Sequence, residues 1–338
     1  MVDLRQAIAQ VRAGDDLSAT QTSELIDQML SGQTADQEIA ELLLAMRTKG
    51  EAVSELIGAA QAMRRHMTPI PHRFERLLDT CGTGGSGSGT FNISTATAIV
   101  VAAAGVPVAK HGNRKATSRS GSADVLVELG VTLETDPAAV TEILQEIGLC
   151  FCFAPKLHPS MRYVMAVRRQ LGVPTLFNLL GPLCNPAAAT HQLLGVGNAV
   201  AQQKIAAAIQ ALSTSRTLVV HGSDGQDEVS LAGPTMVIDV RPQQSSQYQW
   251  TPDSFGLPTV TLDQLQADGP LSSAATIREV LAGALGPARE IVLANAAAAL
   301  WLVGQAADVE AAARLAANTI DSGAAKDKLA QLATASRR

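Results

Sequence analysis

The spacing of hydrophobic residues divides this chain into a helical beginning and an alternating remainder. Within residues 1–70, apolar positions recur every three or four residues, for example over 39–46 and again over 53–60, which is the period of an amphipathic helix. Residues 34–37 fit a capping box for the first of these helices, and Gly50 stands where its C-terminal cap belongs. The apolar faces must pack on the rest of the chain or on a second copy of it.

From Leu77 onward, short apolar runs alternate with amphipathic stretches. Strands are expected near 77–80, 106–109, 149–153, 174–177, 216–220 and 235–240, and helices near 94–104, 121–129, 137–147, 159–171 and 199–212. Such alternation is typical of an α/β fold, in which helices cover both faces of a mostly parallel sheet. We therefore predict a small all-helical N-terminal domain over 1–70 and a larger α/β domain over 75–338, with a surface loop over 241–273 and further helices after it.

Composition and charge narrow the classes of function. Of the 338 residues, 46% are hydrophobic and 17% are charged, so the chain can bury a sizeable core and is not disordered. The 26 basic and 31 acidic residues leave a net charge of −5, and only 3% are aromatic, which disfavours nucleic acid or an anionic membrane as a partner. No run reaches the roughly 20 apolar residues of a membrane span, and the four cysteines lack disulfide or zinc spacing, so we expect a cytoplasmic protein.

The most informative segment runs from Asp79 to Thr95, where a predicted strand meets a predicted helix through a glycine-rich turn. Glycines let backbone N–H groups approach an anion without a Cβ in the way. The N-terminus of the following helix offers further N–H groups and a partial positive charge, and Ser94 and Thr95 add hydroxyls. This combination suits a phosphate or a pyrophosphate.

Other uses of a glycine-rich turn fit this sequence less well. Gly82, Gly84 and Gly87 match the GxGxxG pattern of a dinucleotide fold, but that fold needs an acid after the next strand. Here the strand over 106–109 is followed by Lys110, which suits a phosphate instead. A Walker A loop needs a lysine before Ser or Thr, which the turn lacks, and a plain flexible linker rarely joins an apolar strand to a capped helix.

A second polar segment, residues 110–122, also lies between a predicted strand and a predicted helix. It gathers Lys110, Arg114, Lys115 and Arg119 within ten residues of an acidic chain. A solvated basic loop is the alternative reading. Because the carboxyl ends of parallel strands lie at one edge of a sheet, this segment and the glycine-rich turn are expected to enclose one multiply phosphorylated ligand.

A third segment, Asp224 to Glu228, follows the strand over 216–220. Its acids could form a simple surface turn. Beside two phosphate-binding loops, however, Asp227 and Glu228 suit Mg²⁺, which binds carboxylate and phosphate oxygens and offsets the charge of a leaving pyrophosphate.

Together these segments resemble the anthranilate phosphoribosyltransferase family over nearly the whole chain. The resemblance rests on Cys-Gly-Thr-Gly-Gly (81–85), Phe-Asn-Ile-Ser-Thr (91–95), Lys-His-Gly-Asn-Arg (110–114), Ser-Gly-Ser-Ala-Asp (120–124), His-Pro (158–159), Val-Arg-Arg (167–169), Phe-Asn-Leu-Leu-Gly-Pro-Leu (177–183), Asn-Pro (185–186) and Asp-Gly-Gln-Asp-Glu (224–228). It implies a nucleoside-phosphorylase/phosphoribosyltransferase-like fold. It also implies a homodimer formed through the helical domain. Helices near 159–200 would join this helical domain to the α/β domain.

The resemblance implies a role for each matching position. Contacts to phosphoribosyl pyrophosphate are expected from Gly82, Gly85, Ser86, Thr90, Asn92, Ile93, Ser94, Thr95, Lys110, His111, Gly112, Asn113, Arg114, Lys115, Ala116, Thr117, Ser118 and Ser122. Contacts to anthranilate are expected from Gly82, Asn113 and Arg168, and ligands to Mg²⁺, as two ions, from Ser94, Asp227 and Glu228. The family usually has Asp where this chain has Ser86, which implies a weaker hold on the Mg²⁺ complex of the substrate.

The reaction implied is transfer of the 5-phosphoribosyl group to the amine of anthranilate, with release of pyrophosphate. The attacking amine is neutral at pH 7, so catalysis would rest on positioning and on stabilising the leaving group. His111 is the candidate for a general base, with orientation of its loop as the alternative role. A pyrimidine-nucleoside-phosphorylase-like enzyme and a non-catalytic, nucleic-acid-binding relative are the rival functions. The pair Asn113 and Arg168 argues against the first, and the net charge of −5 against the second.

Overall fold

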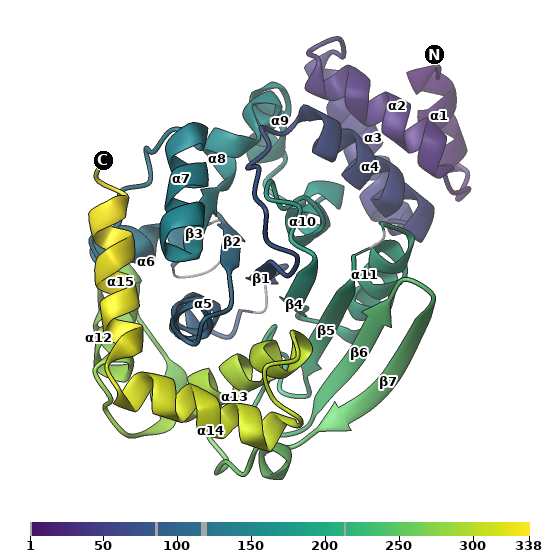
Figure 1. The fold of residues 1–338 in the computed structure, drawn as a ribbon. Coiled ribbons are helices and arrows are strands. Elements are labelled where there is room, and N and C mark those ends of the chain that lie inside the picture. The colour runs from purple at the N-terminus through teal and green to yellow at the C-terminus, as the bar shows by residue number, and fades with distance from the viewer. Residues whose placement is uncertain (1, 85–86, 116–119, 213) are drawn as a thin grey trace.

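The structure is a computed structural model that describes residues 2–84, 87–115, 120–212 and 214–338. The chain begins with four helices, α1 (Leu4–Arg12), α2 (Ala19–Leu30), α3 (Asp36–Lys49) and α4 (Val53–His66). They form a bundle at the opposite side of the molecule from the C-terminus (Figure 1). The helical beginning predicted from the hydrophobic spacing is therefore present.

A seven-stranded sheet forms the centre of the remainder, with the order β3-β2-β1-β4-β5-β6-β7. Its strands are β1 (Leu78–Gly82), β2 (Val108–Gly112), β3 (Leu149–Phe153), β4 (His191–Gly195), β5 (Arg216–Gly222), β6 (Thr235–Arg241) and β7 (Gln244–Trp250). The pairs from β3 across to β5 are parallel, and β6 and β7 extend the sheet as an antiparallel hairpin. The predicted α/β class with a mostly parallel sheet is confirmed.

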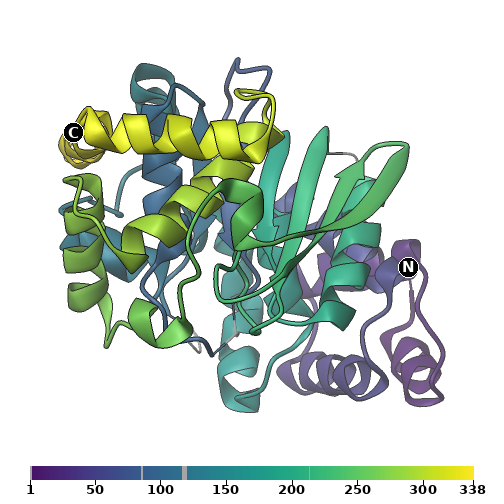
Figure 2. The same cartoon turned by 90° about the horizontal axis from the view of Figure 1, so that it is seen from below.

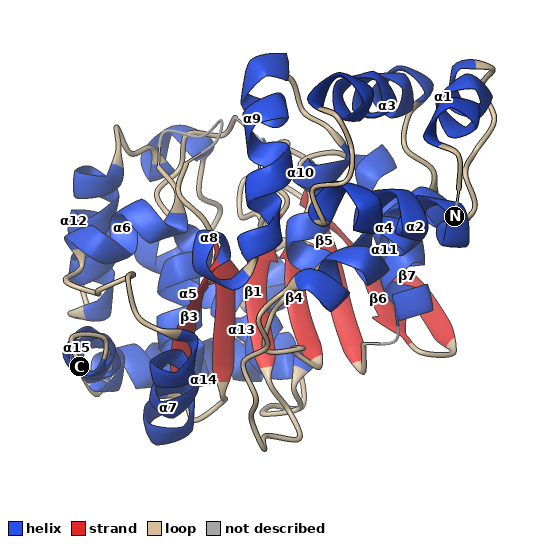
Figure 3. Ribbon diagram, turned by 90° about the horizontal axis from the view of Figure 1, so that it is seen from above, coloured by secondary structure: helices blue, strands red, loops and turns tan. Residues whose placement is uncertain are grey.

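Helices cover both faces of the sheet, as the view in Figure 3 shows. They are α5 (Ile93–Ala103), α6 (Ser122–Glu128), α7 (Pro137–Ile147), α8 (Ala154–Leu157), α9 (Arg162–Leu171), α10 (Leu176–Leu180), α11 (Ala199–Leu212), α12 (Pro270–Leu281), α13 (Pro287–Leu302), α14 (Val309–Asp321) and α15 (Ala324–Ala335). Four short 3₁₀ turns lie at Pro159–Met161, Gly181–Leu183, Pro252–Phe255 and Leu262–Leu265. The C-terminal helices run along the side of the molecule away from the N-terminal bundle (Figure 2).

The alternation of side chains along each strand creates two cores. In β5, Leu218 and Val220 pack with α5 and the C-terminal helices, whereas Val219 between them packs with α4, α10 and α11. The second core also includes the apolar stripes of α1 to α3. The N-terminal bundle therefore shares its core with one face of the sheet and with α9 to α11.

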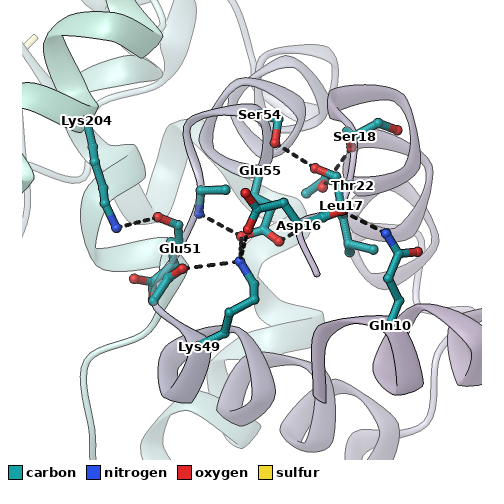
Figure 4. Close-up of polar contacts among 12 residues, drawn as sticks. Gln10, Asp16, Leu17, Ser18, Thr22, Lys49, Glu51, Ser54, Glu55 and Lys204 are labelled. Atoms are coloured by element: carbon teal, nitrogen blue, oxygen red, sulfur yellow. Dashed lines mark hydrogen bonds and ion pairs between the residues drawn. The ribbon is translucent and has the colours of Figure 1, made fainter. Parts of the chain in front are cut away.

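A buried carboxylate holds the turns of the bundle together (Figure 4). Glu55 accepts hydrogen bonds from the backbone N–H of Leu17 at 3.1 Å and of Ala52 at 2.8 Å, and it pairs with the ammonium of Lys49 at 3.2 Å. Both charged side chains are almost fully buried, so each compensates the other. Lys204 of α11 donates to the backbone carbonyl of Glu51 at 2.7 Å, which ties the turn between α3 and α4 to the α/β part.

Several sequence-based predictions of local structure were wrong. Residues 174–177 are not a strand, because Leu176 and Phe177 begin the short helix α10. The strand of this region is β4, which begins at His191. The predicted surface loop over 241–273 contains β7, whose mostly exposed Gln and Ser residues hide the strand pattern. The capping box over 34–37 is absent, since α3 starts at Asp36 without a side-chain cap, whereas Gly50 does end it.

Within the residues that the structure describes, no helix is both long and apolar enough to cross a membrane.

Candidate active site

Glycines end four of the parallel strands at the same edge of the sheet. Gly82 of β1 and Gly195 of β4 are register partners, and Gly112 and Gly222 end β2 and β5. The chain order of the strands reverses between β1 and β4, because β2 and β3 lie on one side and β4 and β5 on the other. In open α/β sheets such a reversal opens a crevice at the carboxyl ends of the strands, where ligands bind.

Asp227 lies in this crevice, against the ends of β1 and β4. A Cβ built on Gly82 would lie 2.6 Å from the Asp227 carboxylate, and a Cβ on Gly195 would overlap the Asp227 carbonyl oxygen. Only glycine leaves room at both positions. The two glycines thus let Asp227, which lies 32 residues beyond the end of β4, approach the strand ends, and this brings the third predicted segment to the first.

The glycine-rich turn and the N-terminus of α5 direct N–H groups at the two acids. Gly84 donates its N–H to Asp227 at 3.2 Å, and Ser94 donates its N–H to Glu228 at 3.2 Å. These are N–H groups that the sequence analysis assigned to a phosphate. Burial of the carboxyl and the adjacent charge of Asp227 raise the pKa of Glu228 to about 8.

Lys110 joins this group from β2. Its ammonium donates to the carbonyl of Thr80 at 2.5 Å and to the hydroxyl of Ser94 at 3.1 Å, and the residue is 4% exposed. Burial lowers the pKa of Lys110, although the charges of Asp79 and Glu228 oppose this. The predicted phosphate ligand Lys110 therefore lies beside the predicted metal ligands Ser94 and Glu228.

Asn92, at the start of α5, is fixed by hydroxyl groups from distant segments. Its side-chain oxygen accepts from Ser120 at 2.6 Å and from Ser273 at 2.9 Å. Thr90 forms an isolated bridge with Gln266, and Ile93 is buried in the core. The buried Thr95 hydroxyl has no hydrogen-bond partner among the described residues.

The segment after β2 is organised by Asp124, a residue that sequence reasoning did not assign. Its carboxylate accepts from the N–H of Lys115 at 2.9 Å and of Gly121 at 3.1 Å, and it pairs with Arg114 at 3.2 Å. The Ser122 hydroxyl donates to the carbonyl of Asn113, which draws the two ends of the loop together. Of the predicted contacts, Gly85, Ser86, Ala116, Thr117 and Ser118 lie outside the described residues.

His111 forms a buried pair with His158. Its Nδ1 lies 2.9 Å from the carbonyl of Gly181, and its Nε2 lies 3.2 Å from Nε2 of His158. Since a carbonyl only accepts, Nδ1 carries the hydrogen, and Nε2 accepts from His158. Burial lowers the pKa of His111, and burial and the neighbouring ring lower that of His158 to about 3. Both nitrogens of His111 are engaged, which favours the orienting role over the general base.

Arg168 lies on α9, at the boundary with the N-terminal bundle. Its guanidinium contacts the Asn178 side chain at 3.4 Å and the Met165 sulfur at 3.6 Å, and it lies over the ring of Phe177. Burial lowers its pKa, but the group stays charged at neutral pH. Within the described part of the chain, these hydrogen bonds do not reach Asn113, so the structure does not join the two predicted anthranilate contacts directly.

The chemistry of the acidic pair fits a hard divalent cation. Asp227 and Glu228 are adjacent acids, and burial first and the charge of Asp227 second raise the pKa of Glu228, so that a bound cation would favour its ionised form. Across residues 2–84, 87–115, 120–212 and 214–338, no three His, Cys, Asp or Glu side chains gather as a metal site. The pair therefore suits an ion that takes its other ligands from a bound phosphate compound and from water.

Comparisons with known proteins agree with this architecture. The glycosyl transferase family helical bundle domain matches residues 5–67, and the glycosyl transferase family a/b domain matches residues 75–326. Proteins named anthranilate phosphoribosyltransferase from Rhodopirellula baltica and Moorella thermoacetica are 59% and 46% identical over 97% and 96% of this chain, and over 96% of each relative.

Solved structures extend the similarity to three dimensions. The anthranilate phosphoribosyltransferase of Thermus thermophilus is 39% identical and superposes with a TM-score of 0.92, covering 98% of this chain and 99% of that one. The Saccharomyces cerevisiae enzyme in complex with PRPP and Mg is 28% identical, with a TM-score of 0.91 and coverage of 99% and 98%.

Proposed function

Since this chain belongs to the anthranilate phosphoribosyltransferase family, we propose how its own residues carry out the transfer. The reaction moves the 5-phosphoribosyl group of phosphoribosyl pyrophosphate to the amine of anthranilate and releases pyrophosphate. The observation that carries the proposal is the convergence of the glycine-rich turn, Lys110 and the pair Asp227–Glu228 at the carboxyl ends of β1, β2 and β4. One edge of the sheet thus offers N–H groups and an ammonium to a single diphosphate, and carboxylates to the metal ion that accompanies it.

The residues around α5 and β2 are proposed to bind the phosphoribosyl pyrophosphate. The turn after β1, with Gly82, supplies backbone N–H groups, and Asn92, Ser94 and Thr95 supply polar side chains at the N-terminus of α5. The basic loop from Lys110 to Lys115, closed on itself through Asp124, encloses the other side. The buried Thr95 hydroxyl, which has no partner within the part of the chain that the structure describes, is ready to donate to a phosphate oxygen.

Asp227, Glu228 and Ser94 are the residues proposed to hold Mg²⁺. Bound Mg²⁺ would neutralise the charge of the diphosphate and so favour its departure. Because the two carboxylates lie against different N–H groups, those of Gly84 and Ser94, we propose one ion near each.

Arg168 and Asn113 are proposed to position anthranilate. The guanidinium of Arg168 suits a carboxylate, and the bond that Asn178 accepts from it helps to fix its direction. The neutral amine attacks the ribose carbon as the bond to pyrophosphate breaks, and one proton of the amine then leaves to solvent or to the departing pyrophosphate. His111, engaged by the Gly181 carbonyl and by His158, orients the loop after β2 without taking that proton.

The predicted homodimer and the cytoplasmic location belong to the same proposal. The resemblance to the family is what supports a dimer formed through the N-terminal bundle. Sedimentation of the purified protein at several concentrations would give the mass of a dimer; a monomer at every concentration would exclude it.

The test of the function is a direct assay. Purified protein with Mg²⁺, phosphoribosyl pyrophosphate and anthranilate should form N-(5-phosphoribosyl)anthranilate and pyrophosphate in equal amounts, measured by chromatography and a coupled phosphate assay. Uridine or thymidine with phosphate should give no free base, which excludes the nucleoside phosphorylase reaction. The proposal fails if the first mixture gives no product, and release of free base in the second would support the nucleoside phosphorylase instead.

A further inference from the structure

Asn295 is a buried polar residue in the middle of an apolar helix. It lies in α13, among the consecutive buried residues Ile291 to Leu300, and it is 0% exposed. An unpaired amide at such a position would lower the stability of the fold, because it loses its hydrogen bonds to water. The side chain therefore needs specific partners, and the identity of those partners shows what it does.

The partners of Asn295 belong to the residue that follows the acidic pair. Its side-chain oxygen accepts the N–H of Val229 at 2.9 Å, and its side-chain nitrogen donates to the carbonyl of Val229 at 2.9 Å. A second bond from the nitrogen, to the carbonyl of Ile291 in the preceding helical turn, holds the amide in place at 2.9 Å. The amide thus pairs with both polar backbone groups of a single residue, as a neighbouring strand would.

The bonds between Asn295 and Val229 act as a clamp, and with them the acidic pair is held from two directions. On the side of the crevice, Gly82 and Gly195 lie close against Asp227. After them, Asn295 holds Val229, and Thr235 accepts the N–H of Ser230 with its hydroxyl at 2.9 Å. Glu228 is directly bonded to Val229, so a rotation of the Val229 peptide would turn the Glu228 carboxylate away from Ser94 and Lys110.

We propose that Asn295 is a positioning residue for Asp227 and Glu228, and that it sets how tightly the Mg²⁺ complex of the substrate is held. Asn295 touches neither substrate; it acts through the Val229 backbone. This inference rests on the proposed function, because it assumes that the two acids hold the metal. It adds a residue that lies outside the matching motifs, 66 positions from the segment it holds.

Gln202 provides a matched control on the other face of the sheet. It is also a buried helix amide, 2% exposed, and its nitrogen donates to the carbonyls of Val219 at 2.8 Å and Met236 at 2.9 Å. These bonds join α11 to β5 and β6 but do not reach the acids. Gln202→Ala therefore removes a comparable clamp, with a comparable loss of stability, away from the metal ligands.

The experiment compares Asn295→Ala with Gln202→Ala. Calorimetry measures the binding of phosphoribosyl pyrophosphate at fixed Mg²⁺ without anthranilate, and electron paramagnetic resonance measures the binding of Mn²⁺ in the presence of phosphoribosyl pyrophosphate. For Asn295→Ala we expect both affinities to fall about 10-fold or more, as for the loss of an outer-shell partner of a metal ligand. The KM for anthranilate should stay within about twofold of wild type, and Gln202→Ala should keep wild-type affinities.

If either alanine variant does not fold, the exchanges Asn295→Gln and Gln202→Asn replace the pair, since each keeps an amide and changes its reach by one methylene. Equal affinities in the Asn295 and Gln202 variants would overturn the proposal, because they would reduce Asn295 to a structural role. A wild-type protein that binds neither ion nor phosphoribosyl pyrophosphate would instead overturn the proposed function itself.

Discussion

The two sides of the candidate site are built in different ways. The side assigned to phosphoribosyl pyrophosphate is fixed by hydrogen bonds and close contacts inside the α/β core, from β1, β4, α5 and α13 to the acidic pair. The side assigned to anthranilate depends on Arg168, whose helix α9 packs against α2 and α3 of the N-terminal bundle. One side is thus part of a core, and the other lies where two groups of helices meet.

This difference suits the two substrates. A diphosphate and its metal carry concentrated charge, and their binding depends on donors and carboxylates held in fixed directions, which a core provides. Anthranilate is a small aromatic acid that has to enter and whose product has to leave, and a boundary between helices can move more easily than the centre of a sheet. Substitutions on the first side should therefore affect stability and the use of metal, and those on the second the use of anthranilate.

The strongest test of the rigid side is Gly195→Ala. The new methyl group would overlap the Asp227 carbonyl, which belongs to the backbone and cannot move as a side chain does. We expect a loss of about 3 kcal/mol or more in the free energy of unfolding and near-complete loss of activity. Denaturant titration and the product assay measure the two effects.

Gly269→Ala is the matched control for this change. Gly269 has an extended backbone, which suits the residue before Pro270, and a Cβ on it would meet no atom within 4 Å, so its unfolding transition should stay close to that of wild type. If Gly195→Ala were as stable and active as Gly269→Ala, the contact of Asp227 with β4 would not constrain the site.

The next largest effect is expected from Asp227→Asn. The amide keeps the size of the side chain but removes one negative charge from the acidic pair, so the proposed metal ligand is weakened. We expect kcat/KM for phosphoribosyl pyrophosphate to fall about 100-fold and the Mg²⁺ dependence to shift to higher concentration. Initial rates over a Mg²⁺ series measure this, and an unshifted Mg²⁺ curve would contradict the role of Asp227.

Arg168→Ala is the corresponding change on the other side. Loss of the guanidinium should raise the KM for anthranilate about 10- to 100-fold, because a charge-assisted hydrogen bond to a carboxylate is removed. The KM for phosphoribosyl pyrophosphate and the Mg²⁺ dependence should change little. A rise in both KM values together would mean that the two sides are not separate.

The sequence was most informative where function is carried by contiguous motifs. The glycine-rich turn, the basic loop and the acidic pair could be assigned to one edge of a parallel sheet from the residues alone, because chain order fixes which strand ends meet. Gly195, Asp124 and Asn295 could not be found in this way, since their importance lies in contacts with residues distant in sequence. Glycines end four of the parallel strands, but this regularity did not point to Gly195 because the sequence analysis predicted no strand over 191–195.

The errors in secondary structure have a similar cause. The apolar run around Leu176 resembles a strand by composition alone, but the Asn178 side chain accepts the N–H of Thr175 and the segment packs against α3 and α4 as the helix α10. β7 was missed because it is an edge strand whose polar residues face solvent along most of its length. In both regions the tertiary surroundings, which a local pattern does not contain, decide the structure.

A pH experiment examines the buried pair of His111 and His158. Since the folded pKa of His158 is about 3 and the unfolded value is about 6.5, the unfolded chain binds the extra proton between these values. Stability contributed by the neutral His158 is therefore present above pH 6.5 and is lost as pH falls, by about 2 kcal/mol between pH 7 and pH 5. The raised pKa of Glu228 has the opposite effect on stability. Between its ordinary pKa of 4.5 and its folded pKa of about 8, the folded protein binds more protons than the unfolded chain, so stability rises as pH falls.

The comparison of wild type with His158→Gln isolates the histidine from Glu228. Glutamine can still donate to His111 but does not titrate, so the difference in unfolding free energy between the two proteins should change by about 2 kcal/mol from pH 7 to pH 5. Denaturant titrations at both pH values measure it. A constant difference would show that the folded protein can protonate this pair, and that water reaches His158 more easily than its contacts and burial indicate.

The smallest effect is expected where the boundary itself is altered. Arg47 of α3 donates to the carbonyl of Pro174, just before the short helix that carries Phe177 and Asn178, the neighbours of Arg168. Because Arg47 is exposed, Arg47→Ala should cost less than about 1 kcal/mol of stability. Yet it loosens the support of Arg168, so the KM for anthranilate should rise about two- to threefold, by a similar free energy.

Arg12→Ala, which removes an exposed contact from α1 to Glu41 of the same bundle, should leave that KM unchanged. If Arg47→Ala and Arg12→Ala had the same KM for anthranilate, the bundle would not support the anthranilate side. The contrast between the two sides of the site would then have to rest on the α/β core alone.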